Sequence, residues 1–131
     1  MAALGIDHGT RRCGIAIEIA GIALPRAVVP TALVLHEVSA LIEKYSVTTI
    51  VVGISPHMSG HSSRQSGIQE SFTTLIAREF PQCQIVLQNE AFSSKQARYE
   101  LEAAGLDSTG DIDDQAAAII LQDYLNSQDS K

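Results

Sequence analysis

Residues 5–17 read GIDHGTRRCGIAI: an apolar run that ends at an acidic residue, a polar turn with two arginines, and a second apolar run. This pattern predicts two strands, Ala2 to Ile6 and Cys13 to Ala20, joined by a short turn. Asp7 then follows the first strand directly, at the strand end where open α/β sheets bind ligands. The alternative is a plain hairpin, because Asp and Gly are common in turns.

The rest of the chain predicts one α/β domain over residues 1–131. A mixed central sheet is expected, an antiparallel meander extended by parallel strands and flanked by helices. Further strands are predicted at Arg26 to Thr31 (shortened by Pro30), Thr48 to Ile54 and Gln84 to Leu87, and helices at His36 to Tyr45, Gly67 to Phe80, Ser93 to Ala104 and Asp113 to Asn126. Ser55 to Ser66 is the one long loop.

Composition limits the function. The net charge of −6 argues against broad, nonspecific phosphate binding, so any contact with nucleic acid must be local. The chain has 5% aromatic residues and no Trp, which disfavours stacking platforms for single strands. No apolar stretch is long enough to span a membrane, and Cys13 and Cys83 suit buried free thiols. We expect a cytoplasmic protein with no membrane partner.

Three acidic residues are candidates for one metal site. Asp7 and Glu90 each follow a strand-like run, and Asp113 stands at the start of the last helix. Clustered carboxylates need a cation, and Mg²⁺ or Mn²⁺ suits their oxygen ligands and can activate water for phosphodiester hydrolysis. In the alternative, Glu90 is a loop residue and Asp113 a helix cap, with Asp111 and Asp114 competing for either role.

Other polar residues could hold a phosphate backbone. Arginine forks suit phosphate, and a Gly- and Ser-rich loop offers amides and hydroxyls. The candidates are Arg11, Arg12, Ser59, Ser62, Arg64 and Lys95. In the alternative these residues are only solvated. His57 and His61 have metal-ligand spacing, but Pro56 and Gly60 argue against the helix that a zinc site there would need.

Four segments together resemble the YqgF/RuvX family of the ribonuclease H-like superfamily. They are GIDHGTRRCGIAI, IVVGISPHMSGHSS, LQNEAFSSKQA and DIDDQAAAIILQDYL, in the family's order. The resemblance implies a ribonuclease H-like fold and places the family's metal ligands on Asp7, Glu90 and Asp113. The last is selected over Asp114 by counting back from the Ile-Leu-Gln run at 120–122.

The resemblance implies a metal-dependent nuclease that acts in 5′-end maturation of pre-16S ribosomal RNA. Its nucleic-acid partner would be a structured RNA precursor or, for the related Holliday-junction resolvases, branched DNA. Junction resolution would demand a homodimer able to cut two strands symmetrically, and the sequence leaves both a monomer and a homodimer open.

Two departures from the family pattern keep other functions open. Asn89 and Ala91 flank Glu90 where the family has Asp and Arg, and residues 107–113 (DSTGDID) are acidic where the family is often basic. A catalytically eroded RNA- or protein-binding relative is therefore one alternative. An actin-like or sugar-kinase ATP-binding module is another, since Asp-x-Gly-Thr resembles the first phosphate loop of those proteins, but their nucleotide cleft needs two domains.

Overall fold

The computed structural model describes residues 2–9, 11–54, 63–89 and 111–129. Its elements are β1 (Ala2–His8), β2 (Arg12–Ile19), β3 (Ile22–Pro30), η1 (Thr31–Leu33), α1 (Val34–Tyr45), β4 (Val47–Ile54), α2 (Ser63–Glu79), β5 (Gln84–Asn89) and α4 (Asp111–Asp129). The predicted helix at residues 93–104 lies outside the described residues.

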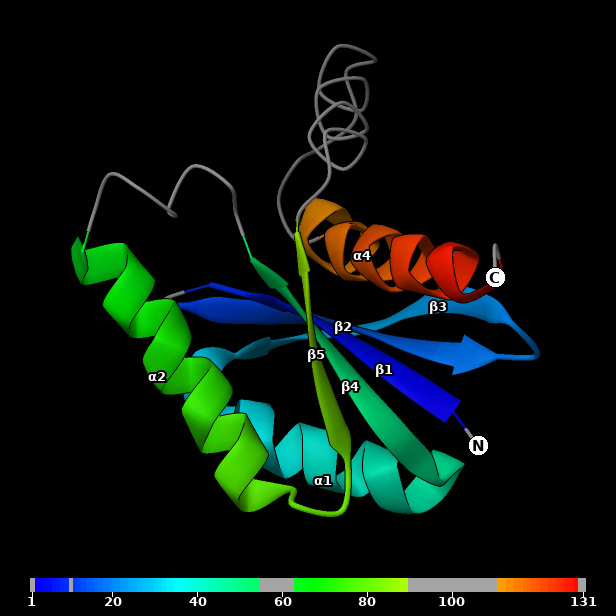
Figure 1. The fold of residues 1–131 in the computed structure, drawn as a ribbon, viewed down its shortest axis with the longest axis horizontal. Coiled ribbons are helices and arrows are strands. Elements are labelled where there is room, and N and C mark those ends of the chain that lie inside the picture. Colours follow the sequence, from blue (N-terminus) through cyan, green and yellow to red (C-terminus); the bar gives the residue numbers. More distant parts are fainter. Residues whose placement is uncertain (1, 10, 55–62, 90–110, 130–131) are drawn as a thin grey trace, which may run out of the picture.

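The strands form one mixed sheet in the order β3-β2-β1-β4-β5. β1, β2 and β3 pair antiparallel, whereas β1, β4 and β5 pair in parallel. Helices α1 and α2 lie on one face of the sheet, and α4 crosses the other face (Figure 1). The predicted mixed sheet, a meander extended by parallel strands, is confirmed.

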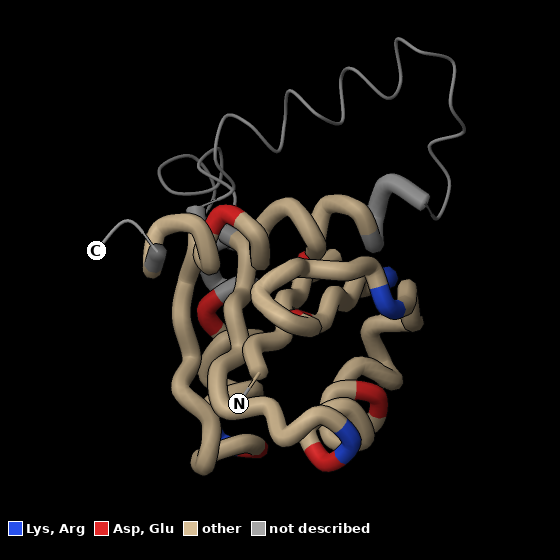
Figure 2. The backbone as a smooth tube through the Cα atoms, turned by 90° about the vertical axis from the view of Figure 1, so that its right-hand side faces the viewer, with Lys and Arg blue, Asp and Glu red and all other residues tan. Residues whose placement is uncertain are grey.

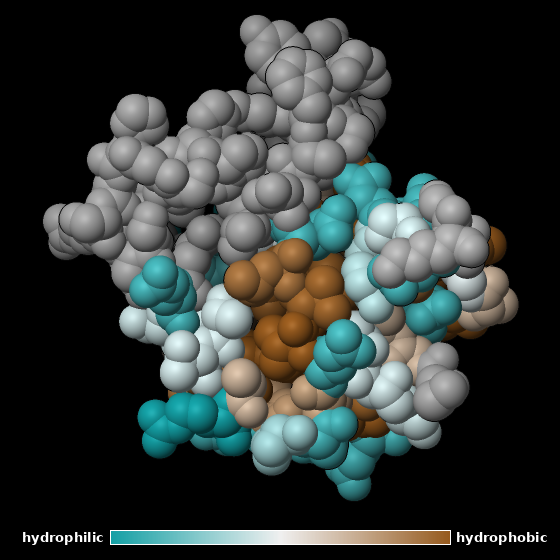
Figure 3. All heavy atoms as spheres, in the orientation of Figure 1, coloured by the Kyte–Doolittle hydropathy of each residue, from teal (hydrophilic) through white to brown (hydrophobic). Residues whose placement is uncertain are grey.

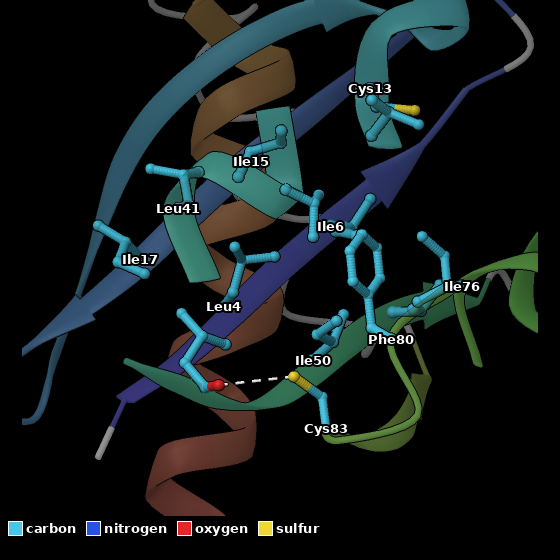
Figure 4. Packing of buried hydrophobic residues seen from close by; sticks show 14 of the residues in the cluster. Leu4, Ile6, Cys13, Ile15, Ile17, Leu41, Ile50, Ile76, Phe80 and Cys83 are labelled. Atoms are coloured by element: carbon cyan, nitrogen blue, oxygen red, sulfur yellow. Dashed lines mark hydrogen bonds between the residues drawn. The ribbon is translucent and has the colours of Figure 1, made fainter. Parts of the chain in front are cut away.

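The two faces of the sheet carry side chains of different size. Large side chains such as Leu4, Ile6 and Ile50 are fully buried against α1 and α2 (Figure 4). The face under α4 instead includes Ala3 and Ala16, which pack against apolar residues of the helix. Small residues let a helix come closer to a sheet, so α4 sits nearer to the strands than large side chains would allow.

At Gly5, α4 lies very close to the sheet. A Cβ atom placed on this residue would lie 2.8 Å from the Cβ of Leu121 and 2.9 Å from the carbonyl oxygen of Ala117. Neither neighbour can rotate away, because one is a backbone atom and the other is fixed to the backbone. Glycine is therefore required at this position of β1 by packing.

β3 is longer than predicted, and the expected start at Arg26 is wrong. A two-residue turn with positive φ at Ala20 (55°) and Gly21 (84°) joins it to β2, as in tight hairpins. Arg26 has no pairing partner on β2, because Ile15 pairs with Ala27 and Ala16 pairs with Pro25. The register of the two strands shifts at this point. β3 is an edge strand, where alternate N–H groups point away from the sheet, so it tolerates proline better than a central strand would.

The opposite edge of the sheet is β5, which carries neither proline nor charge. Leu87 of this strand is half-exposed, and Ile85 and Val86 are partly buried. Figure 3 shows an apolar area on this side of the molecule, where β5 lies in Figure 1. The two edges of the sheet therefore differ in chemical character.

Both cysteines are buried free thiols, as predicted. The Cys83 thiol donates a hydrogen bond to the carbonyl oxygen of Val47 at 3.5 Å, which ties the turn before β5 to the start of β4 (Figure 4). Burial raises the pKa of the Cys83 thiol. This thiol thus has a packing role.

The contact at Gly5 predicts that Gly5→Ala destabilises the protein by about 1–3 kcal/mol, since the added methyl group must push α4 away. Chemical denaturation measures the loss. Gly21→Asn is the control for loss of a glycine without a clash: nothing lies within 4 Å of a Cβ there, and because Asn tolerates positive φ better than most residues, its loss of stability should be smaller than that of Gly5→Ala. Unfolding curves for Gly5→Ala that overlay the parent would contradict the close packing of α4 on β1.

Candidate functional site

The carboxyl ends of the three parallel strands β1, β4 and β5 lie side by side. They form one border of the sheet, here called an edge, although it is not an edge strand. Ile6 pairs with Val52 across β1 and β4, and Val52 pairs with Leu87 across β4 and β5. Asp7 is one residue further along β1, and β5 ends two residues beyond Leu87, at Asn89. Asp7 therefore lies at the edge of the sheet where β5 ends, inside the last part of β1 and not beyond its end as predicted.

Asp7 is flanked by glycine on both neighbouring strands. Gly14 of β2 pairs with it directly, and Gly53 of β4 follows the residue that pairs with Ile6. Alternation along β1 puts Asp7 on the same face as Gly5, the face that α4 covers. The half-buried carboxylate thus has no side chain beside it at the two adjacent strand positions.

Thr31 fixes the turn between β1 and β2. Its hydroxyl donates to the carbonyl oxygen of Gly9 at 2.7 Å, and its backbone N–H donates to the carbonyl oxygen of Arg11 at 2.9 Å. A Cβ atom on Gly9 would lie 2.4 Å from the carbonyl oxygen of Arg12, so the turn is tight. The exposed Arg11 and Arg12 are therefore held at the same edge as Asp7.

Cys13 lies beneath this turn. Its Sγ is 3.5 Å from the Thr31 hydroxyl. Burial, together with the nearby negative charge of Asp7, raises the pKa of the Cys13 thiol. A neutral, buried thiol has a packing role and is a poor nucleophile.

His8 holds the end of β1 from the opposite face. Its ring stacks on Phe72 of α2, with ring centroids 4.0 Å apart and the planes at 22°. Burial lowers the pKa of His8 below its ordinary value of 6.5. The neutral ring is therefore favoured in the folded protein, and α2 is anchored one residue beyond Asp7.

The start of α4 approaches the same edge. This helix contacts β4 and β5 as well as the meander strands, and Figure 1 shows its first turn beside the end of β5. Asp113 is in that turn, one helical turn before Ala117. Its side chain lies outside the described residues, as do those of Asp111 and Asp114.

The other predicted site residues are only partly within the described chain. Arg64 belongs to the first turn of α2, so its predicted place in the loop at residues 55–66 is wrong: the helix begins at Ser63. The Arg64 side chain lies outside what the structure describes. The described residues do not include Ser59, Ser62, Glu90 or Lys95. Among the described residues, no group of three or more His, Cys, Asp or Glu could hold a metal ion.

Basic residues are sparse on the described part of the molecule. Figure 2 shows isolated Lys and Arg positions along the backbone and no continuous basic stripe on that side. This distribution agrees with the net charge of −6. Contacts to phosphate would therefore depend on a few local cations.

The lower pKa of His8 predicts that acid destabilises the protein through this residue. As the pH is lowered through 6.5, His8 takes up a proton more readily in the unfolded chain than in the folded one. The free energy of unfolding therefore decreases as the pH decreases. The variant His8→Phe keeps a ring on Phe72 but cannot titrate. Chemical denaturation measures the free energy of unfolding at about pH 7.5 and about pH 5.5. The decrease between the two pH values should be smaller for this variant than for the parent. Equal losses would contradict the prediction.

Comparisons with known proteins agree with this architecture. The family described as "RuvX: Holliday junction resolvase" matches residues 1–127. A proposed pre-16S rRNA nuclease of Flavobacterium johnsoniae is 31% identical over 95% of this chain and 96% of its own length. Another from Geobacillus kaustophilus is 33% identical over 98% of this chain and 99% of its own.

A solved structure shares the fold. Thermus thermophilus RuvC in complex with a Holliday junction substrate superposes with a TM-score of 0.61 at 15% identity, covering 98% of this chain and 95% of that chain. The predicted ribonuclease H-like fold is thereby confirmed. Within the described residues, the helices are too short or too polar to cross a membrane. With nearly its whole length matched, the chain belongs to the RuvX family of nucleases.

Proposed function

We propose that this protein is a divalent-metal-dependent nuclease that cleaves phosphodiester bonds in the precursor of 16S ribosomal RNA. One observation carries the proposal: Asp7 lies between two glycine positions at the sheet edge where β5 ends and α4 begins. Glu90 follows the last residue of β5, and Asp113 belongs to the first turn of α4. Three carboxylates from distant parts of the sequence can meet there.

The donor set fits a hard cation. Carboxylate oxygens are the ligands that Mg²⁺ and Mn²⁺ prefer, and the two strand positions beside Asp7, Gly14 and Gly53, carry no side chain. When bound, such an ion lowers the pKa of water and stabilises the leaving oxygen. The chain's own part is to hold Asp7 rigidly, through the ladder to Gly14 on one side and the packing of α4 on the other.

Substrate contacts come from the turn that Thr31 fixes. Arg11 and Arg12 are exposed at the same edge as Asp7, so a strand held by their guanidinium groups passes the carboxylates. The first turn of α2, with Arg64, begins at this end of the sheet in Figure 1. Ser59, Ser62 and Lys95 are proposed to add further phosphate contacts.

The substrate is proposed from the relatives. Relatives at least 30% identical over nearly the full length are named as proposed pre-16S rRNA nucleases, which supports a role in ribosomal RNA processing. A cytoplasmic location is part of the same proposal. Junction cleavage is the second candidate, favoured by the family description. It would require a homodimer able to cut two strands symmetrically.

Removal of any site carboxylate should abolish metal-dependent cleavage. We expect Asp7→Asn, Glu90→Gln and Asp113→Asn each to lower kcat by about a hundredfold or more, since even groups that merely support a ligand cost 10–100-fold. The assay measures cleavage of precursor RNA and of four-way junctions with Mg²⁺ or Mn²⁺.

The controls for this assay are Asp111→Asn and Asp114→Asn in the same helical turn, which should keep the parent activity. Loss in Asp114→Asn with retention in Asp113→Asn would transfer the ligand role to Asp114. Equal background cleavage by the parent and Asp7→Asn would contradict the nuclease proposal and favour a catalytically eroded binding protein.

The arginine turn yields a separate prediction on substrate binding. Each of Arg11→Ala and Arg12→Ala should raise KM with little change in kcat. Each should also reduce the slope of log affinity against log salt concentration, by about one for each phosphate that the variant no longer binds. Arg78→Ala is the control, because Arg78 is exposed in the last turn of α2. A salt slope that neither variant changes would refute the phosphate role.

A further inference from the structure

Gln122 of α4 makes the longest-range side-chain contact among the hydrogen bonds described. Its Oε1 accepts a hydrogen bond from the backbone N–H of Ala23 at 2.9 Å, across 99 residues of sequence. Its Nε2 donates to Oδ1 of Asn126 at 3.2 Å, one helical turn further along. The second bond orients the amide so that its oxygen faces β3.

The strand geometry explains why Ala23 needs this acceptor. Ile19 and Ile22 close the two-residue hairpin, and such a closing pair exchanges backbone hydrogen bonds. Bonded and unbonded pairs alternate, so in the next pair, Glu18 and Ala23, the N–H of Ala23 points away from β2. β3 is the edge of the sheet, and Gln122 supplies the partner that no strand provides.

We infer that Gln122 is a positioning residue for the proposed metal site, an inference that rests on the function proposed above. The apolar contact at Gly5 sets how close α4 lies to β1, but apolar packing is not directional. The hydrogen bond to Ala23 is directional and fixes the rotation of α4 about its own axis.

The helix carries this constraint to Asp113. Position 113 is nine residues before Gln122, about 13 Å along the axis and two and a half turns away, so it is on the opposite side of the helix. A roll of about 20° moves an atom about 5 Å from the axis by nearly 2 Å. Metal–ligand distances tolerate only about 0.2 Å. The rotation that Gln122 holds therefore decides whether a ligand on the first turn reaches the ion.

The test measures Mn²⁺ affinity without RNA, from the electron paramagnetic resonance signal of free Mn²⁺ during titration. Gln122→Met keeps the length of the side chain but removes the acceptor, and we expect it to weaken Mn²⁺ binding about tenfold. Gln122→Glu keeps an acceptor oxygen for Ala23 and should bind Mn²⁺ as the parent does. Gln128→Met and Gln128→Glu, at an exposed position of the same helix, control for composition and charge.

A second variant tests the same bond from the strand side. Ala23→Pro removes the N–H on an edge strand that already holds Pro25 and Pro30. It should weaken Mn²⁺ binding as much as Gln122→Met, and the double variant should be no weaker than either. It also stands in for Gln122→Met if that variant does not fold.

The outcomes separate this inference from the proposed function. Parent-like Mn²⁺ affinity in Gln122→Met or in Ala23→Pro would overturn the positioning role while leaving the metal site intact. Equal Mn²⁺ affinity in the parent and in Asp7→Asn would instead show that the proposed metal site is wrong. Loss in both Gln122→Met and Gln122→Glu would also overturn the inference, because the acceptor would then not be the cause.

Discussion

The close approach of α4 to β1 is the constraint on which the rest of the structure depends. A helix can lie this near a sheet only where the facing strand has no side chain, and Gly5 supplies that gap beneath Ala117 and Leu121. Ala3, two residues earlier on β1, and Ala16 of β2, which pairs with Gly5, extend this small surface. The helix can therefore cross the meander and bring its first turn to the ends of β4 and β5. Large residues at these positions would hold α4 away from the sheet edge that carries Asp7.

Directional contacts then fix what apolar burial leaves free. Buried Leu, Ile and Val side chains supply most of the stability, but they allow elements to slide or roll by small amounts. Three polar or aromatic contacts remove that freedom: Thr31 on the β1–β2 turn and His8 on Phe72 near the site, and Gln122 on Ala23 away from it, at the other end of the strands. Each joins residues at least 22 positions apart. The geometry of the site thus depends on few residues, most of them outside the site itself.

The presence of the five strands can be predicted because alternating and continuous apolar runs have short, visible periods, and strands separated by helices are expected to run parallel. Cys13 and Cys83 are buried free thiols, as the apolar runs that they begin predict. The prediction fails at β3, because the two-residue hairpin at Ala20 lacks a strong turn sequence and Pro30 suggests a short strand, although an edge strand tolerates proline. The contact between Gln122 and Ala23 could not be predicted, since a polar pair 99 residues apart leaves no periodic signal. The meeting of Asp7, Glu90 and Asp113 stays a prediction.

The acidic character of the chain fits a site that exists only in the folded state. With a net charge of −6, clustering further carboxylates at one sheet edge costs energy unless a cation or a nearby arginine offsets the repulsion. β1 and α4 carry Asp7 and Asp113, and β5 ends one residue before Glu90; these three elements are brought together by the sheet and by the packing at Gly5. Under the proposed metal site, metal affinity and folding would be linked: an ion that bound only the assembled edge would stabilise the contact of α4 with β1, and a change that loosened this contact would weaken binding of the ion.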